Sequence, residues 1–536
     1  PASTVSGNTV TVASGSLSLS KYTAYTNQST VVPQTAYKLA HFTLTASTTE
    51  AVNINTIYVY FNYVSANVSN FYVKVGNNTT SVKSAPTSGT NRSADSWSVN
   101  YSIPAGTTVD VMVYADIDSN AAGTATIGVY MTGTTASSAA AVTAGKADDA
   151  TTGQTITFTS GTWSSAVDGS TPLNQIVAGG QVVTAAKFKL TAANDSYTVK
   201  EARFTVADDA TSAAINNLII KDGTTVLKEV PYDSTNSYFN VTGLNLLVPA
   251  NTSKVITVDL DLATPSTDGT TVTTAKNAAV TMSYLKIANS QGTESTPSTS
   301  KAGNYLYVFK SVPTFTVGTV GSQGANLSAG GTVSLYNFTA AADSKGPVAL
   351  KQLKFTASVT DAGTAGTVYL DTLKFFRGST DITSSVTIQD TDGDSLESTT
   401  STVSGSNKTV IVTFDTEEQI PAGSPYSYTL KGTAHGFATS STGNDSVSVS
   451  MPTDSTPAGA SAGSAHDHFY TYGSANTGVQ TLATAADGTG TTAANVIWSD
   501  NSATDHDYTY NSSSADWFNG YLVLNLPLDA IGSVAQ

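Results

Sequence analysis

The sequence predicts an all-β protein made of tandem β-sandwiches, and two observations support this prediction. Short segments in which apolar and polar residues alternate occur along the whole chain, separated by clusters of Gly, Asn, Asp and Ser. One of these patterns occurs three times at a nearly constant spacing. Because alternation gives each strand one apolar face, two sheets must pack against each other to bury those faces.

The repeated pattern is centred on Phe42, Phe188 and Phe338, which lie 146 and 150 residues apart. Each Phe belongs to an alternating segment, and a turn containing Pro-Ala follows later in every copy. The alternating segments are 36–46, 182–192 and 332–342, and the turns begin at Pro104, Pro249 and Pro421. Each copy is therefore expected to form an immunoglobulin-like β-sandwich, with a barrel as the alternative architecture.

The repeat predicts three sandwich domains at residues 1–150, 151–305 and 306–452. Thr9–Val12 matches Thr155–Phe158 at the same spacing of 146, so we interpret both segments as first strands, with Phe315–Val317 as the third. Residues 453–536 form a C-terminal tail with strands expected at Asn495–Trp498 and Gly520–Leu526. This tail either completes the third sandwich or contacts a neighbouring subunit.

Composition excludes several classes of function. Charged residues make up 12% of the 536 residues, against roughly 25% in ordinary domains, and the formal net charge is −15. Without a basic stripe, nucleic-acid binding is not expected. Cysteine is absent, which removes thiol catalysis and thiolate metal sites, and no apolar run is long enough to span a membrane. No nucleophile and base stand in a recognisable arrangement, so the sequence does not predict an enzyme.

An acidic loop in the third copy is the sharpest candidate site. It contains Asp390, Asp392, Asp394 and Glu397 around a Gly, and Ca²⁺ is bound in proteins by six to eight oxygen ligands. The loop lies in an insertion, because the Phe-to-Pro spacing is 83 residues here and 62 and 61 in the other copies. The sequence predicts a Ca²⁺ site, and the alternative is a solvated acidic turn.

Two further acidic pairs, Asp116 with Asp118 and Asp259 with Asp261, are candidate ligands of an interdomain cation. Residues two apart in a strand point to the same face, so each pair presents two carboxylates together. The alternative is that these charges discourage strand pairing at a sheet edge.

The tail carries a resemblance to a known family. Asn495-Val-Ile-Trp498-Ser-Asp-Asn-Ser502, and then Asp516-Trp517-Phe-Asn-Gly-Tyr-Leu-Val523 with Leu526-Pro527, are similar to the carboxy-terminal signature of large cell-surface and S-layer proteins of candidate-phyla (Patescibacteria-like) bacteria. The resemblance implies a secreted, extracellular protein of the cell surface. It also implies self-assembly into a Ca²⁺-stabilised homo-oligomeric lattice and contact with cell-envelope glycans.

Three other functions remain open from the sequence. The chain could be the subunit of an extracellular filament built by strand exchange, or a virion surface protein. It could also be a surface adhesin or carbohydrate-binding protein, which an exposed aromatic surface built from some of the 25 Tyr would favour.

Overall fold

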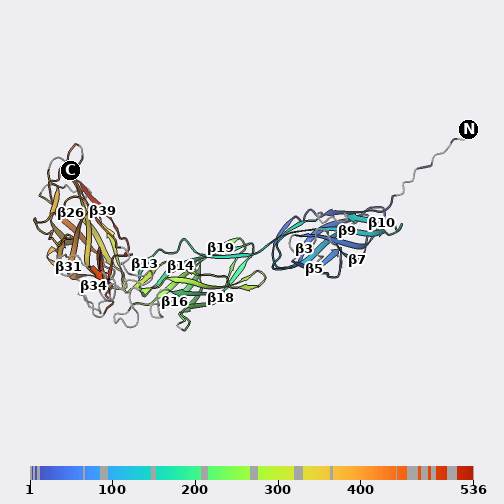
Figure 1. Cartoon of the computed structure of the whole chain (residues 1–536), viewed down its shortest axis with the longest axis horizontal. Helices are drawn as coiled ribbons and strands as arrows, with labels where there is room; N and C mark the ends of the chain where they lie inside the picture. The colour runs from blue at the N-terminus through green and yellow to red at the C-terminus, as the bar shows by residue number, and fades with distance from the viewer. Residues whose placement is uncertain are drawn as a thin grey trace.

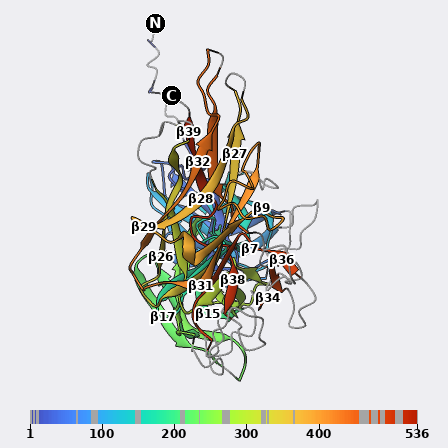
Figure 2. The ribbon, with the colours of Figure 1, turned by 90° about the vertical axis from the view of Figure 1, so that its left-hand side faces the viewer.

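The computed structural model shows three β-sandwiches in a row, with the N-terminus at one end and the third sandwich at the other (Figure 1). The structure describes residues 3, 7–8, 13–63, 67–84, 94–145, 153–206, 215–233, 235–265, 276–318, 327, 330–362, 366–441, 443–454, 469–471, 481–483, 491–503 and 516–534. Figure 2 views the row from its third-sandwich end. Within these residues the only helical element is a 3₁₀ turn, and no helix has the length and apolar character that a membrane crossing requires.

The first sandwich consists of two antiparallel sheets, with one parallel strand pair. One sheet has the order β1 (Leu17–Lys21), β3 (Gln34–Ala46), β8 (Thr108–Ile117), β5 (Val68–Val75) and β6 (Asn78–Thr79). The other has the order β2 (Gln28–Val31), β11 (Thr155–Thr159), β9 (Gly123–Thr135), β4 (Val52–Tyr63) and β7 (Ala94–Ile103), and β10 (Ala141–Gly145) also pairs with β9.

The second sandwich has the same strand order in its first sheet, and its opposite layer is divided into two sheets. One sheet has the order β12 (Thr162–Val167), β14 (Val182–Ala193), β19 (Thr252–Leu262), β16 (Ile215–Asp222) and β17 (Thr225–Pro231). The opposite layer contains β18 (Phe239–Val248), β15 (Tyr197–Val206), β21 (Val280–Asn289) and β22 (Glu294–Ser295), with β23 (Lys301–Ala302) on β21. The strands β13 (Gln175–Ala178), β24 (Leu306–Phe309) and β20 (Lys276–Asn277) form a small sheet.

The third sandwich is the largest. Its first sheet has the order β25 (Pro313–Val317), β26 (Thr332–Ala342), β32 (Tyr426–His435), β28 (Tyr369–Arg377) and β29 (Thr380–Asp381). Its second has the order β30 (Val386–Gln389), β31 (Lys408–Ile420), β27 (Val348–Thr360), β33 (Ser446–Met451) and β39 (Leu528–Val534), with β37 (Val496–Ser499) on β27 and β38 (Trp517–Asn519) on β37. The 3₁₀ turn η1 (Thr383–Ser385) precedes β30. The short strands β34 (Phe469–Thr471), β35 (Thr481–Ala483) and β36 (Thr491–Ala493) form a separate sheet.

The three sandwiches have a β-bulge at the same position of the repeat. The strands β3, β14 and β26 carry Phe42, Phe188 and Phe338, all buried. In each copy the register to the neighbouring strand shifts by one residue four positions before the Phe, between residues 38 and 40, 184 and 186, and 334 and 336. A bulge is a specific local irregularity, so its recurrence at the spacing of the sequence repeat shows that the copies share one architecture.

The structure corrects the assignment of first strands. Thr155–Phe158 lies in β11, which is the last strand of the first sandwich, where it pairs with β2 and β9. The first sandwich therefore extends to Thr159, and the second begins with β12 at Thr162. Phe315–Val317 does belong to an opening strand, β25, but its counterparts are β12 and β1. Thr9–Val12 lies outside the described residues. A periodic sequence pattern has no fixed starting point, and for this reason the predicted domain boundaries fall one strand too early.

The tail contributes strands to the third sandwich. On β27, Thr356–Thr360 pairs with β33 and Ala349–Leu353 pairs with β37, whereas β4 pairs with the single strand β9. The strands β33 and β37 together therefore correspond to β9, and residues 452–495 are inserted between them. The strand β39 closes the sandwich by pairing with β33. The strand expected at Asn495–Trp498 corresponds to β37. The strand expected at Gly520–Leu526 is wrong: this segment turns, with left-handed backbone at Leu522 and Asn525, and β39 begins at Leu528.

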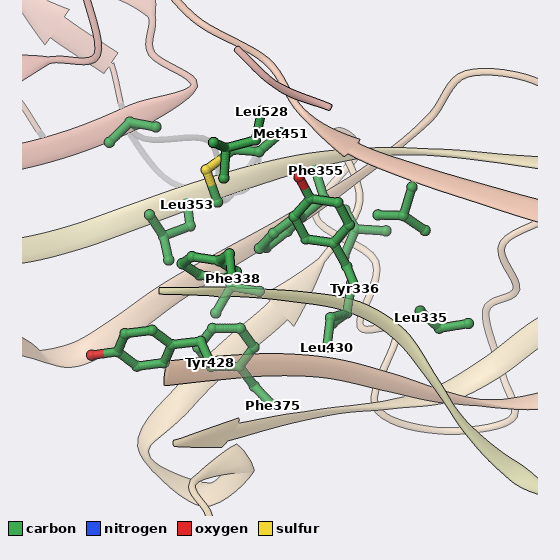
Figure 3. Packing of buried hydrophobic residues seen from close by; sticks show 14 of the residues in the cluster. Leu335, Tyr336, Phe338, Leu353, Phe355, Phe375, Tyr428, Leu430, Met451 and Leu528 are labelled. Carbon is green, nitrogen blue, oxygen red and sulfur yellow. The ribbon is translucent and has the colours of Figure 1, made fainter. Parts of the chain in front are cut away.

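Each sandwich has its own apolar core. In the third, Figure 3 shows Tyr336, Phe338, Phe355, Phe375 and Tyr428 gathered between the two sheets. The rings of Phe338 and Phe375 lie 5.3 and 5.5 Å from that of Tyr428. Fully burying an aromatic or aliphatic side chain stabilises a fold by about 1.5–3 kcal/mol, so such clusters hold the sheets together without disulfides.

A single half-buried carboxylate holds one end of the first sandwich together. Glu50, between β3 and β4, accepts hydrogen bonds from the hydroxyl of Ser138 and from the backbone N–H groups of Gly15, Ser137 and Ser138. The Ser138 hydroxyl is the main cause that lowers the pKa of Glu50, and the backbone donors add to it. The charged form is therefore favoured in the folded state.

We predict that Glu50→Gln lowers the melting temperature of the first sandwich by about 1–3 °C at pH 7. Because the folded-state pKa is lowered, the stabilisation exists above the ordinary pKa of a glutamate and is lost as the pH falls through the folded value. The difference between the two melting temperatures should then be smaller at pH 3 than at pH 7. Calorimetry at both pH values tests this, and a difference that does not change with pH would contradict it.

Candidate functional site

The acidic loop lies between β30 and β31, and its carboxylates do not converge. The Oδ1 atom of Asp390 accepts hydrogen bonds from the backbone N–H groups of Asp392 and Asp394, both at 3.0 Å. Glu397 accepts one from the N–H of Ile388 at 2.8 Å. Gly393 has a φ of 86°, a conformation that other residues rarely adopt, so the loop is a tight turn held by Asp390. Asp392 and Asp394 are exposed.

The pair Asp116 and Asp118 lies at the end of β8. Asp116 accepts hydrogen bonds from the N–H of Ala36 and from the side-chain amide of Asn70, both at 2.7 Å. Ala36 and Asn70 both have left-handed backbone conformations, so this carboxylate supports two irregular positions. Asp118 is exposed, and its backbone N–H donates to the carbonyl of Asn67.

The pair Asp259 and Asp261 lies on β19. Asp259 is 4% exposed and forms an ion pair with Lys221 at 2.5 Å, and it also accepts a hydrogen bond from the hydroxyl of Thr184. Its charge is thus already neutralised by a lysine. Asp261 contacts the amide of Asn216 at 3.4 Å.

In the part of the chain that the structure describes, no three His, Asp or Glu side chains lie close enough together to share one metal ion. The predicted ligands therefore lie in three separate places, and those of the acidic loop would have to reorient around an ion. The Ca²⁺ site stays a prediction.

Two adjoining hollows lie on the third sandwich beside the acidic loop. One, of about 400 Å³, lies between the end of β28, η1 and β31 and is lined by Arg377, Ser385, Asp415, Glu417 and Glu418. The second, of about 420 Å³, contains Glu397 together with Lys374 and Asp381, and Ser384 borders both. Both hollows therefore contain charges of both signs.

An ion pair forms one wall of the first hollow. The guanidinium of Arg377 donates to Glu418 at 2.8 Å, and the hydroxyl of Tyr428 donates to the same carboxylate oxygen at 2.9 Å. Burial is the main cause that raises the pKa of Tyr428, so this phenol stays a donor at every physiological pH. Since these residues are far apart in sequence and lie on ordinary strand positions, no sequence motif could have brought them together.

The second and third sandwiches share an apolar junction. Phe309, the last residue of β24, is fully buried, with its ring centre 5.2 Å from that of Trp498 and 4.8 Å from that of Phe518. The indole N–H of Trp498 donates to the carbonyl of Asn519 at 2.8 Å. Ile176 and Tyr307 of the second sandwich belong to the same apolar cluster as the core of the third.

Polar contacts reinforce this junction. The backbone N–H of Lys310 donates to Asp500 at 2.8 Å, and its ammonium donates to the carbonyl of Asn501 at 2.6 Å. Lys345 of the third sandwich donates to the carbonyl of Gly180 in the second at 2.8 Å. By contrast, only Ser160 and Gly161 lie between β11 and β12, where the first sandwich joins the second. The tail residues that carry the family resemblance are thus part of an interdomain junction.

The first sandwich presents aromatic side chains on one outer sheet face. Tyr72 on β5 is paired in register with Tyr114 on β8, and their rings stack with centres 5.1 Å apart and an interplanar angle of 7°. Both are partly exposed, because the alternating residues Val73 and Val113 point into the core. The ammonium of Lys74 lies 5.1 Å from the ring centre of Tyr114. The sequence contains these tyrosines, but it does not predict that they lie on the same face of one sheet.

Comparisons with known proteins define no family. No family model and no curated protein matches the chain. Among solved structures, it is similar to a putative membrane anchored protein from Corynebacterium diphtheriae (10% identity, 78% of this chain and 85% of that one, TM-score 0.17). It is also similar to the major pilin subunit of Bacillus cereus (9%, 81% and 95%, TM-score 0.21) and to three immunoglobulin domains of titin (8%, 83% and 95%, TM-score 0.17). These values are too low to carry an argument about function.

We predict that Phe309→Ala allows the second and third sandwiches to move relative to each other. Removing a buried Phe costs about 3–5 kcal/mol, and here the loss falls on contacts that join two sandwiches. Small-angle X-ray scattering should show a wider distribution of particle lengths, and calorimetry should resolve an additional transition.

The matched control is Phe42→Ala, which removes an equally buried Phe from the core of the first sandwich. This variant should lower the stability of the first sandwich without broadening the length distribution. If Phe309→Ala loses stability but its scattering profile matches that of the wild type, the junction is not what holds the two sandwiches in line.

Proposed function

We propose that the chain is a structural component of a bacterial cell surface that self-assembles into an S-layer-like lattice and has no enzymatic role. The observation that carries this proposal is the row of three sandwiches whose first sheets have the same strand order and the same bulge. Such a subunit offers related surfaces at regular intervals. Contacts between unlike surfaces of neighbouring subunits propagate without closing, which produces sheets or fibres.

The charge distribution supports assembly that depends on a cation. The chain carries 39 acidic and 24 basic residues, and a stack of such subunits would repel itself. Several carboxylates are already committed to backbone or lysine partners, among them Asp116, Asp259 and Asp390. Asp392 and Asp394 are exposed, so we propose that they are the carboxylates through which Ca²⁺ stabilises contacts.

The first experiment is electron microscopy of the purified protein, with Ca²⁺ and then with a chelator. We expect sheets or tubes that dissolve on chelation. Asp392→Asn combined with Asp394→Asn should raise the Ca²⁺ concentration needed for assembly at least about tenfold, while Asp390 and the turn it holds stay intact.

The control for charge alone is Asp361→Asn combined with Asp529→Asn, which removes two exposed carboxylates elsewhere on the third sandwich. This variant should assemble like the wild type. Fibres instead of sheets would favour a filament, and dispersed monomers in both conditions would refute self-assembly.

A glycan-binding adhesin is the second candidate function, and the stacked pair Tyr72 and Tyr114 favours it. Partly exposed aromatic rings bind the apolar faces of sugars. Asn70 and Asp116 lie beside them, joined by a hydrogen bond of 2.7 Å, and could bind sugar hydroxyls.

We predict that, if this face binds glycan, Tyr72→Ala combined with Tyr114→Ala weakens binding to purified envelope polysaccharide at least about fivefold in calorimetry. The matched control is Tyr58→Ala combined with Tyr130→Ala, which removes a second aromatic pair from the other sheet. Equal losses in both variants, or no binding by the wild type, would refute a glycan site on this face.

A further inference from the structure

Three neighbouring strands of the first sandwich, β3, β8 and β5, carry two cross-strand rows of side chains on their outer face. The residues in register are Lys38, Tyr114 and Tyr72 in one row and His41, Met112 and Lys74 in the next. Successive residues of a regular strand point to opposite faces, so His41, three positions after Lys38, would ordinarily point inward. The bulge between Lys38 and Ala40 places both side chains on the outer face.

The two lysines of these rows lie against aromatic rings. The ammonium of Lys38 is 4.1 Å from the centre of the Tyr25 ring, and that of Lys74 is 5.1 Å from the centre of the Tyr114 ring. Among the residues that the structure describes, neither lysine forms an ion pair with a carboxylate. Both side chains are partly exposed, so an anion that approaches this face can reach them.

Two carboxylates of β8 lie on the same face, and both have other partners. The Oδ1 atom of Asp110 lies 3.0 Å from Nε2 of His41. Asp116 accepts the hydrogen bonds from Ala36 and Asn70 that hold two left-handed residues in place. The positive charges of the two lysines are therefore not neutralised from within this face.

The second sandwich has a neutralised lysine at the equivalent position. Lys221 on β16 corresponds to Lys74, because each is in register, across the central strand, with the residue directly before the repeated Phe. Asp259 then corresponds to Tyr114, and it forms an ion pair with Lys221 at 2.5 Å. The first sandwich therefore has a tyrosine at the position where the second has the carboxylate that neutralises this lysine.

We propose that the outer face of β3, β8 and β5 binds an acidic polysaccharide. Sugar carboxylates pair with Lys38 and Lys74, and sugar rings pack against the stacked pair Tyr72 and Tyr114. The net charge of −15 makes the chain as a whole repel a polyanion, so lysines without a carboxylate partner give this face its selectivity. This inference rests on the second candidate function, glycan binding, and adds the charge that the glycan must carry.

The positions of the two lysines also set a minimum length for the ligand. Lys38 lies on β3 and Lys74 on β5, with β8 between them, so their strands are about 10 Å apart. The two ammonium groups lie over different rings, and each needs its own carboxylate. The ligand therefore contains at least two acidic sugar units.

The test is calorimetric titration of the full chain, without divalent cations, with polygalacturonate and with the same polymer after its carboxylates are reduced to primary alcohols. We expect the acidic polymer to bind at least about fivefold tighter than the reduced one. Lys38→Gln combined with Lys74→Gln should remove this difference, and Lys38→Arg combined with Lys74→Arg, which keeps both charges, should restore it. Because both lysines are partly exposed, all these variants should melt within about 2 °C of the wild type.

The matched control is Lys189→Gln combined with Lys408→Gln, which removes two exposed lysines from the second and third sandwiches. This variant has the same net charge as the Lys38 and Lys74 variant, and it should bind the acidic polymer like the wild type. An equal loss in both variants would show that only the overall charge matters and would overturn the proposal.

A comparison of short ligands tests the requirement for two carboxylates. The trimer of galacturonate should bind the wild type at least about fivefold tighter than the monomer, and the Lys38 and Lys74 variant should bind both equally weakly. Equal binding of trimer and monomer by the wild type would overturn the proposal.

The outcomes separate this inference from glycan binding in general. If the wild type binds both polymers equally, and Tyr72→Ala combined with Tyr114→Ala weakens both, the glycan site stands and the requirement for acidic sugars is overturned. If the wild type binds neither polymer, the acidic-polysaccharide site is overturned, and the titration with envelope polysaccharide decides the glycan function.

Discussion

The geometry of the whole row depends on one covalent constraint: the strand that closes one sandwich is joined by two or three residues to the strand that opens the next. A strand in the middle of a sheet cannot move without breaking its hydrogen bonds on both sides. Since β11 lies between β2 and β9, and β12 pairs with β14, the link Ser160-Gly161 has little room to vary. The constraint turns a chain of domains into an extended subunit with a nearly constant spacing.

The two junctions nevertheless differ in what they add to this constraint. Between the second and third sandwiches, Phe309 packs against Trp498 and Phe518, and Lys310 donates hydrogen bonds to Asp500 and Asn501. Buried aromatic contacts at a domain boundary resist rotation as well as separation. The link between the first and second sandwiches is shorter, and its Gly161 packs against Asp195 and Tyr197 within the second sandwich. Among the described residues, the second and third sandwiches thus share an apolar cluster, whereas the first and second have separate ones.

The sequence was sufficient to predict the fold class, the number of copies and their spacing, because alternation and repetition are local properties that Phe42, Phe188 and Phe338 preserve. It did not predict where a copy starts, since a periodic pattern looks the same from any starting point. The sequence predicts a strand at Gly520–Leu526 because most of these residues are apolar, whereas in the structure Val523 is buried within a turn. The two hollows and the pair Tyr72 and Tyr114 could not be predicted, because they arise from cross-strand register.

The acidic residues show why composition alone is a weak guide to a metal site. Asp390 holds a turn, Asp116 supports two left-handed residues, and Asp259 pairs with a lysine. The buried Asp454 accepts hydrogen bonds from the N–H groups of Asn495, Val496 and Gly520, which fixes both ends of the insertion into the long strand. Burial raises the pKa of Asp454 despite these donors. In this chain, which has no disulfides, carboxylates hold loops against strands through hydrogen bonds. A cation that acts between subunits would therefore have to bind exposed carboxylates that do not hold loops in this way.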